Sequence, residues 1–117
     1  MKILLVTHFF PPGHPGGTES YTYTLARALR GLGHAPQALC AEGWGQGDNW
    51  EPRQQDDVYD GIPVRRTFWN WARTPDPFVY SYDNPEINRR FADWLEEISP
   101  DVVHLTSCYA FGAGIIR

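Results

Sequence analysis

The sequence of 117 residues is long enough for one domain with a modest core and too short for two. Its 42% hydrophobic content indicates a globular protein, and its net charge of −4 excludes a general attraction to nucleic acid or anionic membranes. No apolar run approaches the roughly 20 residues that span a bilayer. Cys40 and Cys108 form neither a CxxC metal pair nor a disulfide framework, so we expect reduced thiols and a cytoplasmic location.

The first 33 residues predict a strand, a loop rich in glycine and proline, and a helix. Residues 2–7 contain an unbroken apolar run, which is typical of a central parallel strand buried on both faces. Over residues 18–32 apolar side chains recur at helical spacing, with Thr18 as the expected N-cap and Gly33 as the C-terminal stop. This pattern is the opening half of a βαβ unit.

The loop between this strand and helix holds the first candidate site. Gly16 and Gly17 directly precede the helix, whose N-terminus presents unpaired backbone N–H groups. Two residues without Cβ atoms let a phosphate approach that backbone closely. The same glycines also suit a tight loop without a ligand, and the local residues leave these alternatives evenly balanced. The loop matches neither the Walker A nor the GxGxxG pattern.

The remaining sequence predicts a mostly parallel α/β sheet with helices on both faces. The further elements are a helix at residues 85–98 and strands at residues 35–41, 62–67 and 101–106. Residues 42–57 lack periodicity and predict a loop, followed by a short extended segment and an Asp60-Gly61 turn. We expect a Rossmann-like three-layer sandwich whose four strands lie in the order 3-2-1-4, with residues 101–106 at an exposed edge.

Several motifs resemble those of a known family. They are Lys2-Ile-Leu-Leu-Val-Thr, Phe-Phe-Pro-Pro, Gly-Gly-Thr-Glu, Leu-Ala-Arg-Ala-Leu and, later, Ser99-Pro-Asp-Val-Val-His-Leu105. In order and spacing they resemble the N-terminus of a family 4 glycosyltransferase, a family with the two-domain GT-B architecture. The resemblance implies that residues 1–117 form a single, partial, Rossmann-like N-terminal domain on the acceptor side. The donor-binding C-terminal domain is absent from this sequence, so we expect the chain alone to be inactive.

The resemblance also implies a reaction and its partners. The parent enzyme would transfer a hexose from a nucleotide-sugar to a sugar, lipid or small-molecule acceptor, with retention as the expected outcome. The nucleotide-sugar is a co-substrate, and no other cofactor is expected. Peripheral membrane contact of the parent is compatible with a lipid acceptor. The four histidines lack metal-ligand spacing, so no metal site is expected.

Candidate site residues follow from the matched motifs and from the aromatic loop near residue 71. Gly16 and Gly17 would bind the donor diphosphate. The candidates for acceptor binding are Thr18, Glu19, Arg65 and Trp71, with Arg66 or Arg73 as further sources of positive charge. The catalytic candidates are His8, His104 and Thr106. His104 resembles the first histidine of the family's Asp-Val-Val-His-x-His pattern, and Thr106 replaces the second, which removes one candidate catalytic group.

Two alternatives to a transferase remain open from the sequence. The first is a non-catalytic Rossmann-like module that binds an anion or a partner domain. The second is half of a related GT-B sugar epimerase. The aromatic residues between positions 69 and 83 fit a sugar-binding loop, and they also fit simple packing of that loop against the domain.

Overall fold

The structure, a computed structural model, describes residues 1–8, 10–11, 17–43, 53–70, 74–76, 83–106 and 111. For residues 17–19 and 42–43 it describes the backbone alone. In chain order the elements are β1 (Lys2–Thr7), α1 (Gly17–Gly31), β2 (Ala35–Gly43), β3 (Arg53–Tyr59), β4 (Ile62–Phe68), α3 (Pro85–Ile98) and β5 (Val102–Leu105). None of the helices described is long and apolar enough to cross a membrane.

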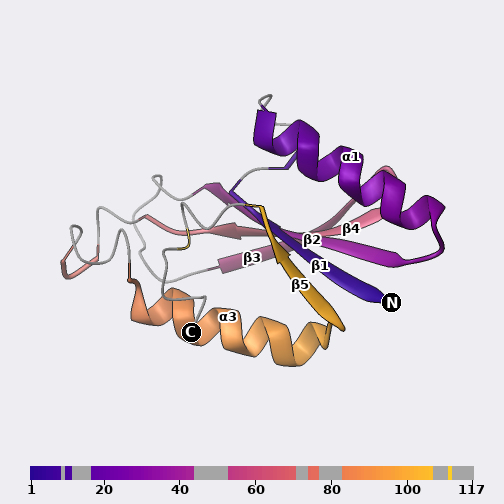
Figure 1. Ribbon diagram of the computed structural model, residues 1–117. Coiled ribbons are helices and arrows are strands. Elements are labelled where there is room, and N and C mark those ends of the chain that lie inside the picture. The colour runs from indigo at the N-terminus through magenta and orange to yellow at the C-terminus, as the bar shows by residue number, and fades with distance from the viewer. Residues whose placement is uncertain are drawn as a thin grey trace.

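Five strands form one sheet in the order β3-β4-β2-β1-β5. β1 pairs in parallel with β2 on one side and with β5 on the other, and β2 pairs in parallel with β4. Helix α1 covers one face of the sheet and α3 covers the opposite face, which gives three layers (Figure 1). The predicted α/β class and the predicted order of the four parallel strands are confirmed.

Strand β3 is the main difference from the prediction. The expected loop over residues 42–57 is wrong where the structure describes that segment, because residues 42–43 extend β2 and residues 53–57 belong to β3. β3 pairs antiparallel with β4 across the predicted turn, in which Asp60 and Gly61 both have positive φ (52° and 74°). This combination is typical of a tight hairpin turn. Six of the seven residues of β3 are exposed, so the strand lacks the apolar alternation that identifies a strand in a sequence.

Helix α1 begins and ends within one residue of its predicted bounds. It starts at Gly17, so Thr18 lies inside the first turn and is not the N-cap that the sequence predicts. At the other end, the N–H of Gly33 donates to the carbonyl of Arg30 and the N–H of His34 to that of Leu29, both at 3.0 Å. Gly33 has a φ of 89°, so it ends the helix in the left-handed conformation that glycine adopts without strain.

Helix α3 has the predicted bounds because both of its ends are capped. The Oδ1 atom of Asn84 accepts hydrogen bonds from the backbone N–H groups of Glu86 (3.0 Å) and Ile87 (3.2 Å). Ser99 ends the helix in the left-handed conformation, and its N–H donates to the carbonyl of Leu95 at 2.8 Å. The buried residues of the helix are Ile87, Phe91, Trp94 and Ile98.

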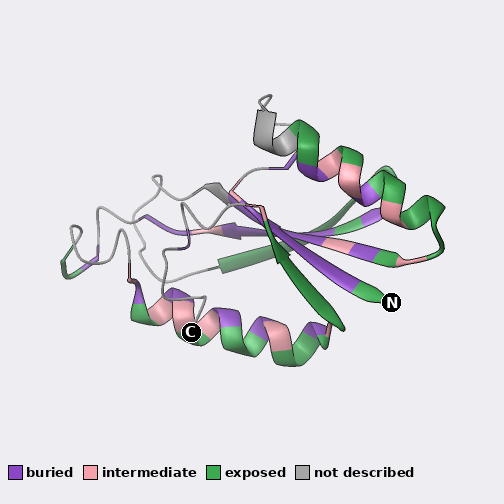
Figure 2. Cartoon of the chain, viewed as in Figure 1, coloured by how far each residue is buried: buried purple, intermediate pink, exposed green. Residues whose placement is uncertain are grey.

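The core has two halves that share β1. On the α3 side the buried cluster contains Leu4, Val6, Leu39, Ala41, Trp69, Ile87, Phe91, Trp94, Ile98 and Phe111. On the α1 side it contains Ile3, Leu5, Phe10, Ala26, Ala38, Cys40, Ile62 and Val64. Alternate residues of β1 enter opposite clusters, so β1 is buried on both faces as predicted, whereas all four residues of β5 are exposed (Figure 2). β5 is therefore at an edge of the sheet among the strands described.

Candidate functional site

The strand order reverses between β1 and β5, and the region at the carboxyl ends of these two strands is called the crevice below. From β1 the chain crosses through α1 to β2, and it later returns through α3 to β5 on the other side of β1. The two crossover helices lie on opposite faces (Figure 1). In open α/β sheets, ligands bind at the carboxyl ends of strands where the order reverses in this way. His8 and Thr106 directly follow β1 and β5 at this point.

Thr106 ties the end of β5 to both β1 and α1. Its N–H and its hydroxyl each donate to the carbonyl oxygen of Val6, both at 2.9 Å. Its Oγ1 atom also lies 3.0 Å from Oγ1 of Thr22, a buried residue of α1. The position of the helix relative to the crevice is thus set partly by a hydroxyl pair.

The N-terminus of α1 supplies hydrogen-bond donors on this side of the sheet. Gly17 is its first residue, and the N–H groups of the first helical turn have no partner within the helix. Thr7, the last residue of β1, is fully buried, and its hydroxyl makes no hydrogen bond to the residues described. The helix dipole and these donors favour an anion or a sugar hydroxyl at this end of the sheet.

Arg66 supports the chain as it leaves β1. This residue of β4 is buried, and its guanidinium donates to the carbonyl oxygens of Phe10 (3.2 Å) and Pro11 (2.7 Å). The ring of Phe10 in turn packs edge-on against Tyr23 and Tyr59. The first residues after β1 are therefore fixed both by hydrogen bonds and by aromatic packing.

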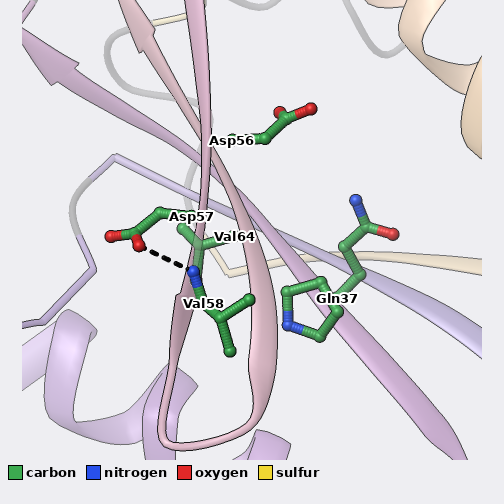
Figure 3. Close-up of a pocket in the computed structure, with 6 residues that line it drawn as sticks. Gln37, Asp56, Asp57, Val58 and Val64 are labelled. Atoms are coloured by element: carbon green, nitrogen blue, oxygen red, sulfur yellow. Dashed lines mark hydrogen bonds between the residues drawn. The ribbon is translucent and has the colours of Figure 1, made fainter.

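A second hollow, of about 300 Å³, lies away from this crevice at the β3 edge of the sheet. Its lining residues are Gln37, Asp56, Asp57, Val58, Pro63 and Val64. Figure 3 shows Asp56 and Asp57 pointing to opposite sides of β3. Each carboxylate pairs with an arginine of β4, Asp56 with Arg65 and Asp57 with Arg66. The hollow therefore offers no unpaired charge to a ligand.

The family described as "Glycosyl transferase 4-like domain" matches residues 16–117. The chain belongs to this family. This match confirms that the chain is a glycosyltransferase-family domain, as its motifs predict.

A solved structure shows the same fold as this glycosyl transferase 4-like domain. It is the catalytic domain of starch synthase IV from Arabidopsis thaliana bound to ADP and acarbose, with a TM-score of 0.50 and 16% sequence identity. The match covers 92% of this chain and 28% of the starch synthase chain, so the domain corresponds to just over a quarter of that protein's length. The search of curated proteins found no match.

The structure of the glycosyl transferase 4-like domain places the three catalytic candidates near the end of the sheet. His8 is half-buried, and its carbonyl accepts from the N–H of Ala41 at 2.9 Å. Thr106 follows β5, the strand that pairs with β1, so it lies at the same end of the sheet. His104 is exposed on β5 and is aligned with Leu5 of β1, which places it two residues before Thr106 and on the α1 side of the sheet.

The other predicted site residues divide into three groups. Gly17 opens α1, and the backbones of Thr18 and Glu19 lie in its first turn. Gly16 and Trp71 lie outside the residues that the structure describes. Arg65 lies on the α3 side of the sheet, where its guanidinium binds the carboxylates of Asp56 and Glu97. The structure therefore does not bring Arg65 together with the residues on the α1 side.

Two residues of this region were not singled out as site residues by the sequence. Thr22 is polar and fully buried, and it follows Thr18 by one helical turn, so its place on the inner stripe of α1 was the available signal. Thr7 is a polar residue at the end of an apolar strand, and this change indicates a polar group at the carboxyl end of β1. In the part of the chain described, no group of three or more His, Cys, Asp or Glu residues could hold a metal ion.

Proposed function

We propose that this domain is the N-terminal, acceptor-side half of an enzyme that transfers a hexose from a nucleotide-sugar to an acceptor. Membership of the glycosyl transferase 4-like family supports the reaction class. The starch synthase with the same fold binds ADP and acarbose, which supports a nucleotide and a sugar as ligands. In the proposed reaction the nucleotide-sugar is a co-substrate, and the domain holds no resident cofactor.

The observation that carries this proposal is the start of α1 at the strand-order reversal. A diphosphate at Gly16 and Gly17 would accept hydrogen bonds from the N–H groups of the first helical turn. The acceptor would lie toward His8, His104 and Thr106, at the ends of the two neighbouring strands. The remaining acceptor candidates are Thr18, Glu19 and Trp71, whereas Arg65 is bound to Asp56 and Glu97 on the α3 side of the sheet.

Catalysis in this proposal needs a second binding surface. In this proposal the domain would form one wall of the binding site, and the donor's nucleoside and sugar would be held by a second domain that closes against it. Positioning of the two substrates supplies much of the rate in such reactions. Residues 1–117 on their own are therefore expected to transfer no sugar.

Replacing Gly17 by valine tests the phosphate site. Gly17 has helical backbone geometry, which any residue can adopt, so valine should alter the ligand contact more than the fold. Loss of one charge-assisted hydrogen bond costs about 1.5–3 kcal/mol, or roughly tenfold to a hundredfold in binding. Gly17→Val and Gly16→Val should lower kcat/KM for the donor by that factor in the protein as its gene encodes it.

A matched control is Gly31→Val at the other end of the same helix. A Cβ at Gly31 meets no atom within 4 Å, and the residue is far from the crevice. Kinetics would be measured with ADP-glucose, UDP-glucose and GDP-mannose beside thermal unfolding. Wild-type donor kinetics in a folded Gly17→Val protein would overturn the phosphate site. Turnover with none of the three donors would count against hexose transfer.

A further inference from the structure

The guanidinium of Arg66 connects three parts of the fold on the α1 side of the sheet. Arg66 is aligned with Cys40 of β2, and Cys40 is aligned with Thr7 of β1, so the three residues form one row across the sheet. From β4 the guanidinium reaches across β2 to the chain that leaves β1. There it binds the carbonyl oxygens of Phe10 and Pro11.

These two carbonyl groups belong to irregular backbone just beyond the strand. Buried backbone carbonyls outside regular structure need a donor, because an unsatisfied polar group is costly to bury. The planar guanidinium provides N–H groups at a fixed spacing, so it can bind the carbonyl oxygens of two consecutive residues at the same time. A lysine ammonium in the same place lacks that fixed geometry.

Arg66 is itself held from the opposite side. Its Nε atom lies 3.4 Å from Oδ2 of Asp57, and Oδ1 of Asp57 accepts from the N–H of Val58 at 2.8 Å (Figure 3). Both oxygens of this half-exposed carboxylate therefore have partners in the protein. The hairpin formed by β3 and β4 thus provides a rigid base for the guanidinium.

We propose that Arg66 is a positioning residue that fixes the start of the β1–α1 connection, and through it the anion affinity of the α1 N-terminus. The proposal rests on the function proposed above. The connection has two fixed ends, the Arg66-bound carbonyls at residues 10–11 and the first helical residue, Gly17. Only five residues link these ends in the sequence, so the position of the first end limits how far from it the backbone before Gly17 can lie.

The test compares three variants of the protein as its gene encodes it. Arg66→Met keeps an unbranched apolar stem and removes the charge and every donor. Arg66→Lys keeps the charge and loses the two-carbonyl geometry. Thr67→Val is the matched control, because the hydroxyl of Thr67 is also buried on β4 and donates to a carbonyl, that of Cys40 in β2, at 2.7 Å.

Two measurements separate positioning from general destabilisation. Calorimetric titration gives the affinities for ADP, GDP and UDP, and for the corresponding nucleosides, which lack phosphates. Hydrogen exchange reports the opening of a peptide covering residues 8–20. Arg66→Met should weaken diphosphate binding on the order of tenfold, leave nucleoside binding unchanged and speed exchange in that peptide. The diphosphate affinity and the exchange rate of Arg66→Lys should lie between those of Arg66→Met and the wild type.

Thr67→Val should be less stable than the wild type, with unchanged diphosphate affinity and unchanged exchange in the peptide of residues 8–20. Wild-type diphosphate affinity in Arg66→Met would overturn the proposal, and if that variant does not fold, Arg66→Lys decides by the same criterion. Equal losses in Arg66→Met and Thr67→Val would also overturn it. If the wild-type protein binds none of the three diphosphates, the proposed function fails. The exchange comparison then decides separately whether Arg66 fixes the connection.

Discussion

Thr22 and Thr106 are 84 positions apart in the sequence, and their Oγ1 atoms lie 3.0 Å apart. This contact joins the second turn of α1 to the end of β5. It therefore links the two elements that border the crevice from different parts of the chain. We therefore expect this hydroxyl contact to contribute to the stability of the domain.

Replacing Thr106 by valine should destabilise the domain by about 1–2 kcal/mol. Valine preserves the shape of the side chain, but it removes the hydrogen bond to the carbonyl of Val6 and the contact with Thr22. Thr106→Ser keeps the hydroxyl and should remain within about 0.5 kcal/mol of the wild type. Urea unfolding gives both values, and equal stability of the valine and serine variants would contradict the structural role of the hydroxyl.

The Tyr23–Asp60 hydrogen bond predicts a pH-dependent contribution to stability. The hydroxyl of Tyr23 donates to Oδ2 of Asp60 at 2.7 Å. This bond raises the pKa of Tyr23 above its ordinary 10.0 and lowers the pKa of Asp60 below its ordinary 3.8. A lowered carboxyl pKa stabilises the fold above 3.8, and a raised phenol pKa stabilises it below 10.0.

The variant Tyr23→Phe should therefore differ most from the wild type between these two pH values. The difference in the free energy of unfolding should shrink as the pH falls below 3.8, because Asp60 becomes protonated. It should also shrink as the pH rises above 10.0, because Tyr23 loses its proton. Tyr21→Phe, an exposed position on the same helix, is the control and should show no such profile. A difference that is constant with pH would refute this assignment.

Asp56 and Glu97 should contribute to stability in a non-additive way. Both bind the guanidinium of the buried Arg65, Asp56 with distances of 2.8 and 3.2 Å and Glu97 with two distances of 3.0 Å. The hydrogen bond to Asp56 is the main reason that the pKa of Arg65 is raised. Either carboxylate alone can neutralise the arginine, whereas removal of both leaves a buried cation without a counter-charge.

We therefore expect Asp56→Ala and Glu97→Ala to cost about 0.5–1 kcal/mol each. The double variant should cost about 1 kcal/mol more than the sum of the two. Guanidinium would perturb these ion pairs, so urea unfolding is the appropriate measurement. Repeating the cycle in an Arg65→Met background is the control, and the coupling should disappear there. An additive cycle in the wild-type background would show that the arginine does not couple the two carboxylates.

Asn84 provides a test of the α3 N-terminus. Its Oδ1 atom caps the helix, while its buried Nδ2 group makes no hydrogen bond to the residues described. Asn84→Ala should cost about 1–2 kcal/mol, because two backbone N–H groups lose their acceptor. Asn84→Ser keeps an acceptor and removes the unpaired amide, so it should be close to the wild type. Thermal unfolding of the two variants checks this, and a serine variant as unstable as the alanine variant would disagree.

The parts of the fold that were predicted correctly have strong local signals. β1 is a continuous apolar run, and α3 has an asparagine cap, a proline in the first turn and a clear buried stripe. The strand order followed from the family resemblance together with the rules for parallel crossovers. The end of β3 and its turn were predicted, but residues 53–57 were missed because they form an edge strand with polar side chains on both faces.

The candidate site could be predicted less completely, because its contacts join distant residues. The positions of His8, Gly17 and Thr106 at one end of the sheet follow from strand and helix boundaries. The position of Thr22 on the inner stripe of α1 signals that it is buried, but nothing in the sequence shows that its partner is Thr106. Arg65 and Arg66 were expected to bind a ligand, and their partners Asp56 and Asp57 could not be predicted because residues 42–57 were expected to form a loop.

The pairing of β1 has a consequence for the order in which the domain folds during synthesis. β1 begins at residue 2, yet its partner β5 begins at residue 102, so about a hundred residues must be made before β1 has neighbours on both sides. Until then the most apolar strand of the sheet has one open side, and such unpaired strands are prone to association. The first strand of the described sheet is thus completed by the last one, and a nascent chain paused before residue 102 should depend on chaperones for its solubility.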